Sequence, residues 1–469
     1  MTARRIGFIL GVAGFLATLL LPAPAGMPDR AWIVAGLVVL MASWWMTEAV
    51  PLTVTALAPF LILPFAGVMS AGETASAYYS PILFLILGGA FIALAIERTG
   101  LHRRLAFTIL ERVGKKGGTT RLLLAFMMTA AILSMAISNT SSALIMMPMA
   151  LAVLAGGGLG PHEREGLAGA LPMGIAFAAS IGGLGTIVGS PTNAIAVGLL
   201  DQSIGVRISF AEWSAYGLPV VILGVPLAAW IISRVQKVSS HPFDLAAARE
   251  AVAISGGWTA PERRLVPLVA VTFMLWMLSP LYAPYLPPGS LTDGTIAIAA
   301  GVALFLLPDG TGRPMLNWEE ANRAPWDVIM MFGGGLALAA GMGASGLADW
   351  LGRSLLPLSA VPLPVVALAI VAMVILVTEF ASNVATASGI IPVVASLIAA
   401  LGADPLMLAM PAALAASWGF MLPAGTGPNA IAWATGHIEL PRMVKAGLML
   451  DIAGGVMIVG LVWIVAAVI

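Results

Sequence analysis

Two short triplets with polar side chains, Ser138-Asn139-Thr140 and Ser382-Asn383-Val384, stand inside long apolar stretches of the chain. Hydroxyl and amide groups donate and accept hydrogen bonds, which suits recognition of a small anion, and their oxygens suit a cation such as sodium. Residues 122–161, which surround the first triplet, include no charged side chain and are about twice as long as one membrane crossing. We therefore expect a helical hairpin that turns at each triplet.

A hairpin tip at mid-membrane depth leaves backbone groups without partners, which is tolerated only beside a buried or hydrated cavity. The helix that begins at a tip presents free N–H groups to an anion, and the helix that ends there presents carbonyls to a cation. Glycine and proline residues predict two further helix breaks, at 185–193 and 423–429. We expect the tips and breaks to meet at one site. None of these four segments includes Arg or Lys, so a bound anion there needs co-bound cations.

The composition indicates that an all-α membrane protein positions this site. Of the 469 residues, 60% are hydrophobic and 9% are charged, and apolar runs of membrane-spanning length recur along the chain. The short alternating segments of a β-barrel are absent from the sequence. A net charge of zero suggests no nucleic-acid partner. The lack of cysteine excludes thiolate-ligated metals, and the four histidines are too scattered for a catalytic metal site.

Hydropathy predicts about 11 transmembrane helices in addition to the two hairpins. The expected spans are 6–24, 31–48, 51–69, 81–97, 165–200, 215–233, 264–280, 291–308, 325–343, 405–436 and 443–467. All of the 22 basic residues except Arg30, Arg207 and Arg353 then fall on the cytoplasmic side. This pattern puts the N-terminus in the cytoplasm and the C-terminus outside, in a multi-pass protein of the inner (plasma) membrane. The first 25 residues also imitate a cleavable signal peptide, but we expect a retained first helix.

Matching motifs divide the chain into two inverted repeats. Gly88-Gly89 matches Gly334-Gly335, the two triplets match each other, and the break at 185–193 matches the break at 423–429. We expect an N-terminal helix (1–30), a first repeat (31–235), a cytoplasmic linker (236–262) and a second repeat (263–469). The first repeat holds a re-entrant hairpin (121–162) and a broken helix (165–200), and the second holds their counterparts (361–400 and 405–436). Because cations flank the first hairpin, we expect it to enter the membrane from the cytoplasm, whereas the second enters from outside. Inverted repeats of this kind are typical of secondary transporters.

The sequence resembles the divalent anion/sodium symporter (DASS) family, whose best-known members are the INDY-type sodium-coupled di- and tricarboxylate transporters. The resemblance covers nearly the whole chain and includes 45–52 (WMTEAVPL), the two triplets and the two G-S/T-x-x-N breaks. It implies a homodimer of elevator-type protomers, each with a scaffold and a transport domain. It also implies symport of a C4-dicarboxylate, such as succinate, malate or fumarate, with at least two Na⁺ ions.

The resemblance also assigns residues to sites. The substrate contacts are Ser138, Asn139, Thr140, Ser382, Asn383, Val384, Pro191, Thr192, Gly427 and Pro428. The first sodium site is Ser134, Ser138, Asn139 and Gly189, and the second is Thr378, Ala381, Asn383 and Ala424. Val384 departs from the family pattern, which commonly has Thr there, and this leaves the exact substrate open.

Other readings remain open at this stage. A carboxylate exchanger without sodium, or a citrate- or sulfate-type carrier of the same architecture, has the same sequence features. A membrane enzyme needs a nucleophile, a metal cluster or an acid–base pair, and at membrane depth the sequence offers only Glu379. This carboxylate is either functional or a structural hydrogen-bonding group, because the first repeat has Met135 in its place.

Overall fold

The structure is a computed structural model that describes residues 2–114, 118–160, 162–241, 243–244, 257–402 and 404–468. Within these ranges the chain forms helices, and the sole β-type pairing is an isolated bridge between Pro308 and Pro314. The predicted all-α fold is confirmed. Parts of the linker expected at 236–262, together with Lys115, Lys116 and both chain ends, lie outside the described residues.

The first half of the chain runs from α1 to α12. Its helices are α1 (Ala3–Leu20), α2 (Asp29–Thr47), α3 (Leu52–Thr55), α4 (Ala58–Phe65), α5 (Ala71–Ala77), α6 (Pro81–Thr99), α7 (Leu101–Gly114), α8 (Thr119–Ser134), α9 (Asn139–Gly156), α10 (Leu167–Gly183), η1 (Ile187–Gly189), α11 (Pro191–Ile204) and α12 (Phe210–Val235). The second half runs from η2 to α23. Its helices are η2 (Val238–Ser240), α14 (Ala260–Tyr282), η3 (Ala283–Tyr285), α15 (Asp293–Leu306), α16 (Trp318–Ala321), α17 (Trp326–Ser345), α18 (Leu347–Leu355), η4 (Leu356–Ala360), α19 (Leu363–Phe380), α20 (Asn383–Leu401), α21 (Pro405–Ala415), α22 (Gly427–Ala434) and α23 (Leu440–Ala466).

Among the described residues, ten helices are long and apolar enough to cross a membrane: α1, α2, α6, α9, α12, α14, α17, α19, α20 and α23. Most of the predicted spans coincide with one of these helices. The span expected at 51–69 is not one regular helix, because two short helices, α3 and α4, occupy 52–65. Pro51 precedes α3 and Pro59 opens α4, so this segment has two helix starts and cannot keep one uninterrupted ladder of backbone hydrogen bonds.

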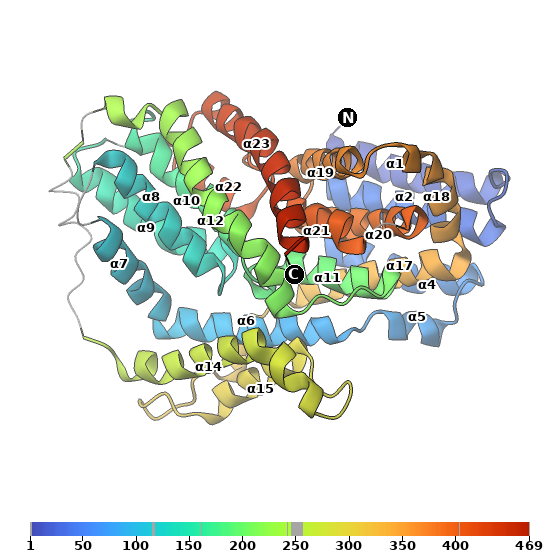
Figure 1. The fold of residues 1–469 in the computed structure, drawn as a ribbon, viewed down its shortest axis with the longest axis horizontal. Helices are drawn as coiled ribbons and strands as arrows, with labels where there is room; N and C mark the ends of the chain where they lie inside the picture. Colours follow the sequence, from blue (N-terminus) through green and yellow to red (C-terminus); the bar gives the residue numbers. More distant parts are fainter. Residues whose placement is uncertain are drawn as a thin grey trace.

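The two halves place equivalent elements at opposite ends of the molecule. Helices α8 and α9 form a helical pair that reaches the centre from one end, and α19 and α20 reach it from the other (Figure 1). The short helices α7 and α18, which follow α6 and α17 directly, also lie at opposite ends (Figure 1). Helices α10 and α11 are separated by a break at 184–190, and α21 and α22 by a longer break at 416–426.

Small residues allow the helices around the centre to approach closely. A Cβ atom at Gly182 of α10 would lie 2.3 Å from the carbonyl oxygen of Ala131 in α8. A Cβ atom at Gly88 of α6 would lie 2.4 Å from the carbonyl oxygen of Ala297 in α15. A Cβ atom at Gly334 of α17 would lie 2.4 Å from the carbonyl oxygen of Ala56. Backbone-to-backbone packing of this kind is typical of membrane helices, where van der Waals contact replaces the hydrophobic effect. The paired glycines of the repeat therefore set the spacing of helices on which the central site depends.

Candidate functional site

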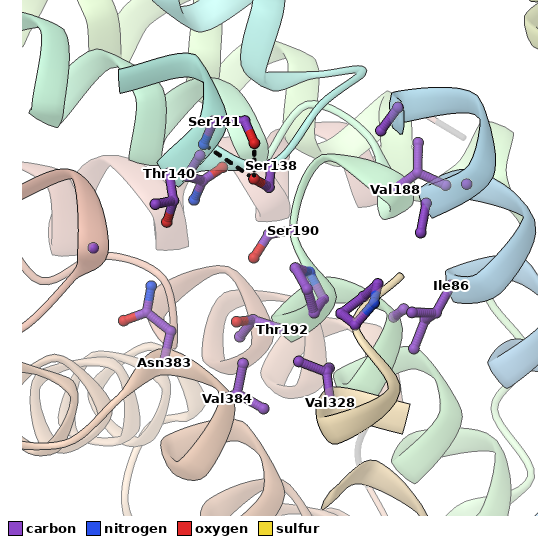
Figure 2. Close-up of a pocket in the computed structure, with 18 of the residues that line it drawn as sticks. Ile86, Ser138, Thr140, Ser141, Val188, Ser190, Thr192, Val328, Asn383 and Val384 are labelled. Atoms are coloured by element: carbon purple, nitrogen blue, oxygen red, sulfur yellow. Dashed lines mark hydrogen bonds between the residues drawn. The ribbon is translucent and has the colours of Figure 1, made fainter. Parts of the chain in front are cut away.

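A cavity of about 490 Å³ lies where the hairpin tips meet the helix breaks. In Figure 2, Thr140 of the first tip, Ser190 and Thr192 of the first break, and Asn383 and Val384 of the second tip border the same space. All the residues predicted to bind substrate line this cavity: Ser138, Asn139, Thr140, Pro191, Thr192, Ser382, Asn383, Val384, Gly427 and Pro428. Segments that are far apart in the sequence therefore converge on one site.

The two tips are built alike. Ser138 caps the N-terminus of α9, and its hydroxyl oxygen accepts a hydrogen bond from the N–H of Ser141 at 3.1 Å. Ser382 caps α20 in the same way and accepts from the N–H of Ala385 at 3.2 Å. Each cap fixes the start of a helix at the cavity wall, so the positive end of each helix dipole lies where a carboxylate can bind. A dicarboxylate can thus place one carboxylate at each tip.

The first tip also packs against the second break. A Cβ atom at Gly427 would lie 2.5 Å from the hydroxyl oxygen of Thr140, so the absence of a side chain at 427 leaves room for this hydroxyl. Asn429, two residues further, is fully buried, and its amide nitrogen donates to the carbonyl oxygen of Leu422 at 3.1 Å. Asn193 does the same in the first break, where its amide donates to the carbonyls of Gly183 and Thr186 at 2.7 and 2.9 Å. The two asparagines hold the chain across both breaks.

An oxygen-lined position lies behind the first tip. One end of the Asn139 amide lies 2.7 Å from the Ser134 hydroxyl, 3.1 Å from the Gly189 carbonyl oxygen and 3.3 Å from the Ala179 carbonyl oxygen. Only a hydrogen-bond donor or a cation is stable among these oxygens. The amide therefore presents its nitrogen there, or it presents its oxygen together with a cation.

The second repeat forms an equivalent position behind its own tip. The Thr378 hydroxyl lies 2.9 Å from the Asn383 side-chain oxygen and 2.7 Å from the Ala416 carbonyl oxygen. One hydroxyl hydrogen cannot serve both acceptors fully. Thr378 is fully buried, whereas Asn383 also lines the cavity. Like the first position, this one combines hydroxyl, amide and carbonyl oxygens, a ligand set that suits a hard monovalent cation.

Comparison with known proteins agrees with this architecture. Residues 2–469 match the family described as the sodium:sulfate symporter transmembrane region. The chain belongs to this symporter family. The symporter is 37% identical over 474 residues to a sodium-dependent dicarboxylate transporter, SdcS, of Staphylococcus saprophyticus, an alignment that covers 98% of this chain and 91% of SdcS. The SdcS protein of Staphylococcus aureus is 36% identical over 478 residues, with the same coverage.

Two solved structures share the fold of the symporter. The YdaH transporter of Alcanivorax borkumensis superposes with a TM-score of 0.56 at 15% identity and covers 93% of this chain, with 98% of YdaH included. MtrF of Neisseria gonorrhoeae superposes with a TM-score of 0.61 at 14% identity and covers 98% of this chain, with 94% of MtrF included. YdaH is described as a transporter and MtrF as an antimetabolite efflux pump, and the likeness shows that this chain shares their fold.

The remaining predicted sodium ligands of the symporter stand behind the tips or in the breaks and do not line the cavity. They are Ser134, Gly189, Thr378, Ala381 and Ala424. Ser138 uses its hydroxyl to cap α9 and to bond the Ser141 hydroxyl at 3.0 Å. The structure adds two carbonyls that sequence reasoning missed, those of Ala179 and Ala416. No side-chain signal could have revealed them, because every residue type carries a backbone carbonyl.

Glu379 has a structural role in the symporter. Its side chain is 1% exposed, and its two oxygens accept hydrogen bonds from the N–H groups of Met421 and Leu422 at 2.9 and 3.1 Å. These groups belong to the break after α21, where the helical hydrogen bonds have ended. Glu379 does not line the cavity. Of the two roles left open by the sequence, the contacts support the structural one.

Two charged residues that the sequence analysis does not predict at the site lie at the edge of the cavity. Arg323 and Glu97 line the cavity, and their side chains form an ion pair with a nitrogen–oxygen distance of 3.8 Å. Arg323 lies in the turn before α17, and Glu97 lies in the last turn of α6. The tips and breaks themselves contribute no Arg or Lys to the cavity, in agreement with the sequence.

Proposed function

We propose that this protein is a secondary active transporter that carries a C4-dicarboxylate together with at least two Na⁺ ions across the inner (plasma) membrane. The observation that carries the proposal is the pairing of two capped helix N-termini at the cavity with an oxygen-lined position behind each tip. The helix ends bind the two carboxylates, and the sodium ions offset their charge. The SdcS proteins, which are similar over nearly the whole chain, are named as sodium-dependent dicarboxylate transporters.

In this proposal each sodium ion is cargo. The first binds among Ser134, Ser138, Asn139 and Gly189, and the second among Thr378, Ala381, Asn383 and Ala424. The helical pairs and broken helices move together as a transport domain against a scaffold that includes α6, α14, α15 and α17. Two such protomers form a homodimer.

Uptake of labelled succinate into proteoliposomes tests the proposal. An inward sodium gradient should drive succinate accumulation, whereas an equal choline gradient should not. Equal uptake in choline, together with acceleration by succinate inside the vesicle, would replace the proposal with a sodium-independent exchanger. Sodium-driven uptake of sulfate or citrate in preference to succinate would keep the coupling and change the substrate.

The proposed topology predicts that residues 121 and 162 lie on the same, cytoplasmic face. The natural sequence has no cysteine, so a single cysteine at either position is the sole thiol. Each should react with a membrane-impermeant thiol reagent in inside-out vesicles and stay unreactive in right-side-out vesicles. Labelling of the two positions from opposite faces would contradict a hairpin between them.

Val384→Thr should raise the apparent affinity for succinate by about tenfold or less. Val384 lines the cavity at the place that Thr140 occupies in the other tip. Threonine has nearly the shape of valine, and its hydroxyl can give the second carboxylate a charge-assisted hydrogen bond worth about 1–3 kcal/mol before desolvation. Half-saturating succinate and half-saturating sodium should both be measured, with Val384→Ala as the control that adds no donor. An unchanged preference among succinate, malate, citrate and sulfate would mean that residue 384 does not contact the substrate.

A further inference from the structure

A second cavity adjoins the central one on the side that the basic residues assign to the cytoplasm. Its volume is about 760 Å³, and it shares Leu94, Glu97, Ser141 and Arg323 with the central cavity. We call this second cavity the vestibule. A substrate that leaves the tips through the vestibule passes the Arg323–Glu97 ion pair.

The vestibule has a surplus of positive charge. Arg98 is held by Asp309 at 2.5 Å, and Glu320 is held by Arg313 at 2.7 Å, so these two vestibule residues are neutralised by partners outside it. Burial opposes ionisation of Asp309, but hydrogen bonds from Thr311 and the charges of Arg98 and Arg313 hold its pKa below the usual value. Among the described lining residues, Arg103 and Arg323 remain against Glu97, which gives this part of the vestibule a net attraction for anions.

The ion pair between Arg323 and Glu97 is weak enough to exchange. Its nitrogen–oxygen distance is 3.8 Å, and the Arg323 side chain is 70% exposed. Ion pairs with such exposure contribute little to stability. Glu97 also lies in the last turn of α6, where the helix dipole disfavours a negative charge. The guanidinium has five N–H donors in a planar fork that fits a carboxylate, and Glu97 at 3.8 Å leaves them largely unused.

We propose that Arg323 transiently binds the dicarboxylate on the cytoplasmic side. A substrate carboxylate then displaces Glu97 from its ion pair with Arg323. The inference rests on the proposed function, because it takes a dicarboxylate as cargo. In this arrangement one substrate carboxylate bonds to Arg323 while the other leaves the first tip at Ser141, which lines both cavities. When no substrate is present, Glu97 pairs with Arg323 again.

Two single substitutions with opposite expected effects test this proposal. In inside-out vesicles, Arg323→Gln should raise the half-saturating succinate concentration about three- to tenfold, because one charge-assisted contact is lost at an exposed site. Glu97→Gln should lower it about two- to threefold, because the competing carboxylate is gone. In right-side-out vesicles neither substitution should change the half-saturating concentration. Raising the ionic strength with choline chloride from about 0.05 to about 0.5 M should shrink both effects, because the charges are exposed to solvent.

The controls separate this role from a structural one. Arg264→Gln removes an equal charge on the same side but lines neither cavity, so it should leave both affinities unchanged. Arg323→Lys keeps the charge and should recover part of the loss even if Arg323→Gln folds poorly. Shifts in the same direction for Arg323→Gln and Glu97→Gln, or equal shifts at both membrane faces, would overturn the proposal. Failure of the unsubstituted protein to take up succinate with sodium would instead overturn the proposed function.

Discussion

Gly189→Ala should raise the sodium concentration needed for half-maximal succinate uptake by about tenfold or more, because a displaced buried oxygen ligand costs about 1–3 kcal/mol. An added Cβ atom would lie 2.5 Å from the carbonyl oxygen of Gly183 and 2.9 Å from that of Ser134. Both atoms belong to the backbone, at the ends of α10 and α8, so no side chain can rotate away. The helix ends must separate, and this separation spreads the oxygens around the Asn139 amide.

A matched control lies four residues earlier in the same break. A Cβ atom at Gly185 would lie 3.1 and 3.2 Å from side-chain atoms of Met135 and 3.3 Å from the Gly182 carbonyl oxygen. Methionine is flexible, so Gly185→Ala should be tolerated with little change in sodium dependence. Thermal unfolding in detergent should confirm that both variants fold. Wild-type sodium dependence in a folded Gly189→Ala protein would show that this break does not hold a transported cation.

Glu379→Ala should destabilise the protein by about 2–6 kcal/mol, because two buried N–H groups each lose an acceptor at a cost of about 1–3 kcal/mol. The groups are those of Met421 and Leu422, and both lie in the break between α21 and α22. The loss should appear as a lower unfolding temperature and as lost transport, since this break borders the second tip.

Glu379→Gln is the matched control. Glutamine keeps one acceptor oxygen for the break, and its new amide N–H can reach Asp451 of α23, whose buried carboxyl lies beside Glu379. One of the two N–H groups still loses its acceptor, so this variant should lose about half as much stability as Glu379→Ala and keep part of the transport. If Glu379→Ala unfolds at the wild-type temperature but has lost substrate affinity, Glu379 acts on the substrate rather than on the break.

The tips and breaks could be predicted because their physical causes are visible in the sequence. A polar triplet in an uncharged stretch of double length requires a turn, and glycine with proline in an apolar span requires a break. The substrate contacts that the family resemblance implies lie in these tips and breaks, and they all line one cavity. Their individual roles rest on the family resemblance and remain predictions.

Other parts of the site depend on tertiary contacts that leave no mark in the sequence. The carbonyls of Ala179 and Ala416 were missed because their position depends only on where a helix ends. The sequence predicts Arg323 only as a cytoplasmic loop cation, since its distance from the tips along the chain gives no sign of its place at the cavity. Hydropathy predicts one continuous span at 51–69 because it averages over Pro51, Pro59 and Pro64.

Asn139 connects the proposed sodium site with the proposed carboxylate site at the first tip. Its side chain lies among the oxygens of Ser134, Ala179 and Gly189, while the same residue begins α9 and lines the cavity. Under the proposed function, a sodium ion that holds this amide would also steady the start of α9 and so prepare the tip for a carboxylate. Thermodynamic linkage then requires reciprocity: the factor by which bound sodium tightens succinate equals the factor by which bound succinate tightens sodium.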